Sequence, residues 1–123
     1  MIAEAMSSIL LIDDDPAFRR LARKTLNGTG LTVVGEASTA AEGSAAARIL
    51  EPQIVLVDVG LPDTNGVSLA RELVGLPWAP TVVLTSVDPD AVSAEDILRS
   101  GARGFVPKQD LPGTGVALLT AGE

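Results

Sequence analysis

The sequence predicts an α/β protein built on one open, doubly wound sheet of five parallel strands, a (βα)5 arrangement. Short apolar runs recur along the 123 residues, and four of them stop at, or just after, an acidic, hydroxyl or basic residue. These runs alternate with segments of helical periodicity. Such alternation is typical of βα units, whose strands pair in parallel and bring their carboxyl ends to one edge of the sheet.

The first strand and helix have the clearest boundaries. A strand over residues 8–12 leads into residues 13–16, which are three aspartates followed by proline. An acidic cap before a proline at the first helical position is a strong signal for a helix start. Apolar residues, Leu21 among them, then recur at helical spacing as far as Leu26, an arrangement that leaves Arg19 and its basic neighbours mostly on the solvent side.

The middle of the chain repeats this pattern twice. A strand over 31–37 precedes a capping box that starts at Thr39 and opens an alanine-rich helix to Leu50. The continuous apolar run Ile54–Val57 indicates a central strand that is buried on both faces. A loop rich in glycine and proline follows it, and a short third helix is predicted over 67–73.

The last two units are shorter. A fourth strand is predicted over 81–85, followed by a helix that is capped by either Asp88 or Ser93, and a brief fifth strand lies at 105–107. The final segment, 111–121, carries proline and glycine close to its start, and both are poor helix formers. We expect at best a two-turn helix there.

Composition narrows the classes of function. With 46% hydrophobic residues, the chain can form one core of ordinary size, so we expect a single domain. A net charge of −7 disfavours direct binding to nucleic acid or to an anionic membrane. Because cysteine and histidine are both absent, disulfides, thiolate–zinc sites and Ser-His-Asp triads are excluded, and any metal must be bound by oxygen. No segment is predicted to be a signal peptide or membrane span, so we expect a cytoplasmic protein.

Charged and polar side chains are predicted to meet where the strands end. Asp13 and Asp14 follow the first strand, Asp58 the third, Thr85 the fourth and Lys108 the fifth. Like charges held this closely resist joint ionisation, and carboxylate oxygens are the ligands that hard divalent cations prefer. This edge of the sheet is therefore suited to a divalent cation and a phosphoryl group.

Four segments of the chain resemble the bacterial response-regulator receiver domain: LIDDDP at 11–16, VLVDVGLP at 55–62, LTS at 84–86 and GARGFVPK at 101–108. Among receivers, the sequence is most similar to those of the NarL-like (LuxR-type) DNA-binding regulators. The resemblance implies a flavodoxin-like fold with strand order 2-1-3-4-5. It also implies one receiver domain over residues 1–123, which could be a fragment of a longer regulator with a C-terminal helix-turn-helix domain.

The resemblance assigns the chemistry of the site to particular residues. Asp58 would be the phosphoacceptor and would take its phosphoryl group from a histidine kinase. Asp13 and Asp14 would hold Mg²⁺ together with Asp58 and the backbone carbonyl of Gly60. Lys108 would contact a phosphoryl oxygen as a point charge.

The resemblance also implies how the signal would be passed on and how long it would last. The Thr85 hydroxyl and the Ser86 backbone N–H would take a second phosphoryl oxygen, and Thr85 with Phe105 would form the switch toward the fourth and fifth helices. Gly60 and Val87 stand where family members often carry side chains that assist or block the hydrolytic water. Since neither can hydrogen-bond that water, we expect slow loss of the phosphate.

Two alternatives remain open on the residues alone. The Asp-x-Asp within 13–15 also suits an aspartyl-nucleophile phosphatase, although the chain has no cap domain. A pseudo-receiver that binds partners without phosphorylation is the other, and the complete acidic set argues against it. The preferred interpretation is a signalling domain without independent substrate turnover. It would work with a histidine kinase, could form a homodimer, and would reach DNA only through a domain absent from this chain.

Overall fold

Five parallel strands form one sheet in the computed structural model, which describes residues 7–121. The strand order is β2-β1-β3-β4-β5, so the direction in which strands are added reverses between β1 and β3. The predicted fold class and strand order are confirmed. The strands are β1 (Ser7–Ile12), β2 (Leu31–Ala37), β3 (Ile54–Asp58), β4 (Thr81–Ser86) and β5 (Gly104–Pro107).

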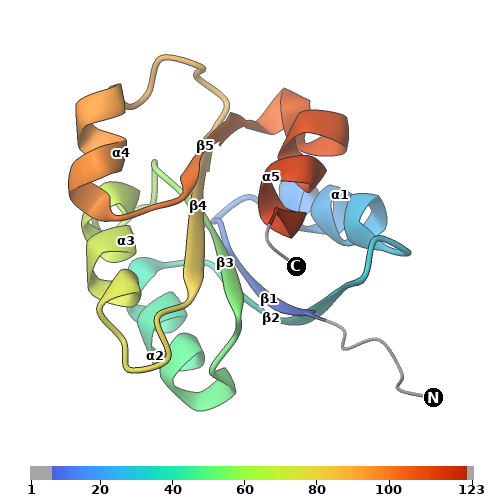
Figure 1. The fold of residues 1–123 in the computed structure, drawn as a ribbon, viewed down its shortest axis with the longest axis horizontal. Helices are drawn as coiled ribbons and strands as arrows, with labels where there is room; N and C mark the ends of the chain where they lie inside the picture. The colour runs from blue at the N-terminus through green and yellow to red at the C-terminus, as the bar shows by residue number, and fades with distance from the viewer. Residues whose placement is uncertain (1–6, 122–123) are drawn as a thin grey trace.

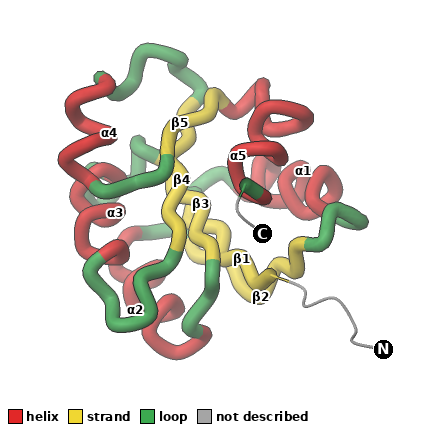
Figure 2. The backbone as a smooth tube through the Cα atoms, viewed as in Figure 1, coloured by secondary structure: helices red, strands yellow, loops and turns green. Residues whose placement is uncertain are grey.

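Helices cover both faces of this sheet. They are α1 (Pro16–Leu26), α2 (Ala40–Leu50), α3 (Gly66–Val74), α4 (Ala94–Ser100) and α5 (Val116–Thr120). Figure 1 shows α2, α3 and α4 on one side of the strands and α1 and α5 on the other, and Figure 2 shows the same layers with the loops picked out. No helix within residues 7–121 is long and apolar enough to cross a membrane.

The core has two layers because side chains alternate across each strand. In β1, Leu10 and Ile12 pack in the layer under α2 and α3, whereas Ile9 and Leu11 pack in the layer under α1 and α5. Every residue of β3 is buried, as its continuous apolar run predicts for a central parallel strand. The layers hold the carboxyl ends of the strands in a fixed array.

Side-chain caps set where the helices begin. Asp15 caps α1 by accepting the N–H of Ala17 at 2.9 Å, with Pro16 at the first helical position, as predicted. Of the two candidate caps for α4, the structure selects Ser93. It forms a reciprocal capping box with Asp96.

The segment after β5 is irregular. A 3-10 turn over Lys108–Asp110 is followed by a distorted turn over Leu111–Gly115, in which Pro112 and Gly113 have non-helical dihedral angles. Only five residues of α5 are regular helix, which agrees with the short helix predicted for this segment.

Two expectations about α1 were wrong. Leu21, predicted on the apolar face, is 49% exposed. Arg19, predicted mostly on the solvent side, has a side chain that is only 16% exposed. Its guanidinium turns back toward the sheet, where it donates to the carbonyl oxygen of Asp13 and pairs with Glu36 of β2.

The start of α3 lies very close to the end of β3. The N–H of Gly66 donates to the carbonyl of Val59 at 2.9 Å. A Cβ atom on Gly66 would lie 2.3 Å from the carbonyl oxygen of Asp58 and 2.8 Å from the Cα of Val59, closer than atoms in folded proteins approach. Glycine at position 66 therefore allows the backbone after Asp58 to turn as it does.

We expect Gly66→Ala to lower the free energy of unfolding by about 2 kcal/mol or more, because the added methyl group must displace backbone rather than a flexible side chain. Gly75→Ala is the matched control, since a Cβ there meets its nearest atom at an ordinary 3.5 Å. Chemical denaturation of both variants measures the difference. Equal stability of the two variants would contradict the close-contact argument.

Candidate functional site

The strand register brings the predicted site residues together at the carboxyl edge of the sheet. Asp58 pairs directly with Thr85 across β3 and β4. Ile12 pairs with Val57, so the next residue along β1, Asp13, lies beside Asp58.

The acidic residues form a compact cluster at this edge. Asp13, Asp14 and Asp58 each offer a carboxylate oxygen, and these oxygens lie within 4.8 Å of one another. Asp13 and Asp58 are 2% and 6% exposed, whereas Asp14 is exposed. Oxygen donors from two buried carboxylates and one exposed carboxylate are a fitting donor set for a hard divalent cation.

One lysine offsets part of this negative charge. The Lys108 ammonium lies 2.8 Å from Oδ2 of Asp13 and 3.7 Å from Oδ2 of Asp58. It also lies 4.6 Å from the centre of the Phe18 ring of α1, a distance at which the ring face attracts a cation. Because Lys108 directly follows β5, the end of that strand fixes where the ammonium sits.

Burial still raises the pKa of Asp13 above its ordinary value. The hydrogen bond from Lys108 and the backbone N–H of Asp15, which donates to Oδ1 at 2.9 Å, act in the opposite direction, and the charge of Asp58 raises the pKa further. The net effect is a buried carboxylate that is harder to ionise than a free one. An additional cation at the cluster would relieve this cost.

The hydroxyl of Thr85 is buried and has no hydrogen-bond partner in the described part of the chain. A buried hydroxyl without a partner is costly and uncommon. Since Thr85 pairs with Asp58 in the sheet, this hydroxyl lies on the strand next to the buried carboxylate and suits a ligand oxygen. The neighbouring Ser86 uses its own hydroxyl to accept the N–H of Asp88 at 3.1 Å, so that hydroxyl supports the loop after β4.

The loop between β3 and α3 is anchored at both ends. The N–H of Gly60 donates to Oδ1 of Asp58 at 3.1 Å. Three residues further on, the Asp63 carboxylate accepts the N–H groups of Ala40 and Ala41 at 2.8 and 3.0 Å, which caps the start of α2 and lowers the pKa of Asp63. Sequence analysis missed this bond, because nothing in the local pattern links a loop aspartate to a helix 22 residues earlier.

Phe105 and Val87, the other residues singled out, lie at the margin of the cluster. Phe105 pairs with Leu84 and is partly buried against the core layer under α3 and α4. Val87 is exposed directly after β4 and lines an open groove of about 320 Å³ with Phe18 and Lys108. Both residues are therefore close in sequence and space to the strand ends that carry Thr85 and Lys108.

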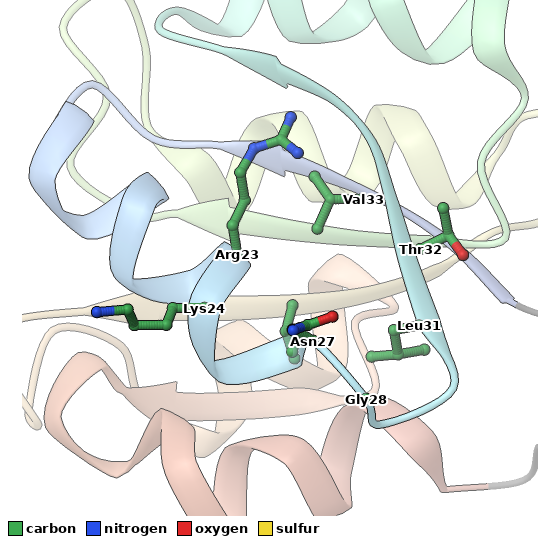
Figure 3. Close-up of a pocket in the computed structure, with 8 residues that line it drawn as sticks. Arg23, Lys24, Asn27, Gly28, Leu31, Thr32 and Val33 are labelled. Carbon is green, nitrogen blue, oxygen red and sulfur yellow. The ribbon is translucent and has the colours of Figure 1, made fainter.

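A second surface groove, of about 490 Å³, lies away from the acidic cluster. It is formed by the end of α1 and the start of β2, and Figure 3 shows its lining residues. Arg23 extends from α1 alongside Val33, whereas Lys24 points away. None of the clustered carboxylates lines this groove, so the candidate site is the acidic edge.

Comparison with known proteins gives consistent results. A family model described as the response regulator receiver domain matches residues 9–118. A putative transcriptional regulator of Pseudomonas aeruginosa is 34% identical over 105 residues, which are 85% of this chain and 51% of the relative. The DNA-binding transcriptional activator DevR/DosR of Mycobacterium tuberculosis is 37% identical over 114 residues, which are 91% of this chain and 52% of that protein. This chain spans about half the length of these curated relatives.

A solved structure agrees with these relatives. The two-component response regulator of the LuxR family from Aurantimonas sp. SI85-9A1 has a TM-score of 0.81 and 28% identity, over 90% of this chain and 80% of that one. The strand order, the acidic edge and the family match over residues 9–118 lead to the same conclusion. The chain belongs to the response-regulator receiver domain family, and its curated relatives include transcriptional regulators.

Proposed function

We propose that this domain accepts a phosphoryl group from a histidine kinase on Asp58 and thereby switches a surface that binds a partner. The observation that carries the proposal is the position of Asp58. It is buried at the end of the central strand, beside a second carboxylate, an ammonium and an unpartnered hydroxyl. Asp13 shares the carboxylate and ammonium neighbours, but it is Asp58 that pairs with Thr85 across the neighbouring strands.

In the proposed reaction, the Asp58 carboxylate is the nucleophile. One of its oxygens forms a bond to phosphorus while the bond from phosphorus to the donor nitrogen breaks, which gives an acyl phosphate. The donor imidazole keeps the electron pair of the broken bond. Lys108, 3.7 Å from Asp58, stabilises negative charge on a phosphoryl oxygen, and the Thr85 hydroxyl and the Ser86 N–H donate to another.

The acidic cluster fits a Mg²⁺ site. Asp13, Asp14 and Asp58 would hold the ion, together with the backbone carbonyl of Gly60. When bound, Mg²⁺ would neutralise charge on the attacking and transferred oxygens. The chain itself positions two of these carboxylates before any ligand arrives: the Asp15 N–H donates to Asp13, and the Gly60 N–H donates to Asp58.

The output would be transcriptional. Because this chain spans about half the length of relatives described as transcriptional regulators, we infer that it is the receiver part of a longer cytoplasmic regulator. Contact with DNA would be made by the other part, and a homodimer is one way to present it.

Thr85 and Phe105 would carry the switch toward α4 and α5, since Phe105 already packs against the core layer beneath α3 and α4. The domain would pass through its own cycle of phosphorylation and dephosphorylation, and it would not act on an independent substrate.

Asp58 should be the only phosphoacceptor. Incubation with a small phosphodonor and Mg²⁺ should add one phosphate to the wild type and none to Asp58→Asn, because Asp58 ends the buried central strand and faces both the Asp13/Asp14 pair and Lys108. Intact-protein mass spectrometry measures the gain. Stable phosphate on Asp13 would instead support the aspartyl-nucleophile phosphatase, and a lack of both phosphate and Mg²⁺ binding would support a pseudo-receiver.

Asp13→Asn should raise the stability of the protein in metal-free buffer at neutral pH. Since the pKa of Asp13 is raised in the folded state, its ionised form destabilises the fold above that pKa, and protonation removes the penalty as the pH falls through it. The advantage of the variant should therefore shrink on acidification and disappear below the unfolded pKa. Denaturation at several pH values in a chelator measures this difference. The same substitution should weaken Mg²⁺ binding, and an unchanged affinity would contradict the proposed ligand set.

Gly60→Glu should shorten the lifetime of the acyl phosphate several-fold, since a carboxylate beside Asp58 can orient the hydrolytic water that glycine cannot. The position has room, because a Cβ there would meet Oδ1 of Asp58 at 3.9 Å. Ala45→Glu, on an exposed position of α2, adds the same charge away from the site. Decay of the phosphorylated protein is followed by mass spectrometry. Identical decay of both variants would show that water positioning at residue 60 does not limit the lifetime.

A further inference from the structure

We infer that Arg19 is a positioning residue for the acidic cluster: it fixes the turn between β1 and α1, and with it the direction of Asp14, in the geometry that a divalent cation needs. The inference rests on the proposed function of the cluster. It concerns an arginine of α1 that does not bond to the carboxylates of Asp13, Asp14 or Asp58.

The Arg19 side chain reaches back from the first turn of α1 to the end of β1. Its Nη1 atom donates to the carbonyl oxygen of Asp13 and lies 3.4 Å from the hydroxyl of Ser38. Its Nε atom donates to Oε1 of Glu36 at 2.7 Å. The planar guanidinium thus links α1 to the end of β1 and to β2, and the Glu36 carboxylate holds it in place.

With this bond, each polar group of Asp13 has a partner. Its backbone N–H donates to the carbonyl of Ala37 at 2.9 Å. Its Oδ1 accepts the N–H of Asp15 at 2.9 Å, and its Oδ2 pairs with the Lys108 ammonium at 2.8 Å as an ion pair. The carbonyl is the remaining group, and Arg19 is the donor that satisfies it.

The carbonyl of Asp13 belongs to the peptide group that leads into Asp14. A peptide group is planar and rigid, so a fixed carbonyl also fixes the direction of the Asp14 N–H and the position of its Cα. The Asp14 side chain is exposed. Among residues 7–121, no hydrogen bond or ion pair holds it in another direction. Arg19 therefore fixes the backbone position from which the exposed Asp14 side chain extends.

Arg23 separates this geometric role from a general effect of charge. It lies one turn further along α1, extends toward the sheet beside Val33 (Figure 3), and pairs with the same Glu36. Its side chain is 48% exposed, and its bond goes to Glu36, not to the turn that carries Asp13. Arg23→Gln therefore removes the same charge and a bond to the same carboxylate while leaving the Asp13 carbonyl bonded.

The test is Mg²⁺ affinity, measured by titrating the metal alone and following amide NMR shifts, at a temperature where denaturation curves show each variant to be folded. We expect Arg19→Gln to bind Mg²⁺ about tenfold or more weakly than the wild type, the range found when partners of metal ligands are removed. Arg23→Gln should stay close to the wild type. In metal-free protein, the amide resonance of Asp14 should shift in Arg19→Gln and not in Arg23→Gln.

Arg19→Lys keeps the charge but cannot reach both Glu36 and the carbonyl with a fork, so it should lose most of the same affinity. It also serves if Arg19→Gln fails to fold. Equal Mg²⁺ affinity in the position 19 and position 23 variants would overturn the inference, as would full affinity in Arg19→Lys. A wild type that binds no Mg²⁺ would instead overturn the proposed function, so the two failures are distinguishable.

Discussion

The candidate site depends on one ammonium group that lies against two buried carboxylates. Without Lys108, Asp13 and Asp58 would share a buried edge with no opposing charge, and the pKa of Asp13, already raised by burial, would be raised further. The position of this ammonium requires the whole sheet: β5 must pair with β4 so that the chain ends its strand next to Thr85 and Asp58. Phe18 of α1 then provides the ring face beside the ammonium.

Two features of this edge reduce stability in ways that a ligand would compensate. The pKa of Asp13 is raised by burial, and the Thr85 hydroxyl is buried without a hydrogen-bond partner among residues 7–121. Neither of these features is needed to form the two core layers, which consist of apolar side chains packed beneath helices. Perturbed titration and unpaired polar groups at one edge are a common mark of a functional site, because ligands supply the missing partners.

The sequence predicted the fold and the clustered residues well because both follow from local rules. Strand ends can be recognised from apolar runs, and parallel pairing brings these ends to one edge. Arg19 and Asp63 could not be placed in this way. Arg19 lies on the polar side of a helical pattern, and its contact depends on how far a long side chain reaches around the end of β1. Asp63 looks like an ordinary turn residue, and its partner helix comes earlier in the chain.

The contrast between Asp13 and Asp14 indicates what would limit binding at the cluster. The Asp13 carboxylate is buried, accepts the Asp15 N–H and pairs with Lys108, so it loses little freedom when a ligand arrives, whereas the exposed Asp14 must still give up rotamer freedom. Lys108 also has two possible partners: it lies closer to Asp13 than to Asp58, at 2.8 and 3.7 Å. In the proposed function, Asp13 would hold the metal, and Lys108 would then be available to a phosphoryl oxygen on Asp58. Metal affinity and phosphoryl stabilisation would then be linked through the single side chain of Lys108.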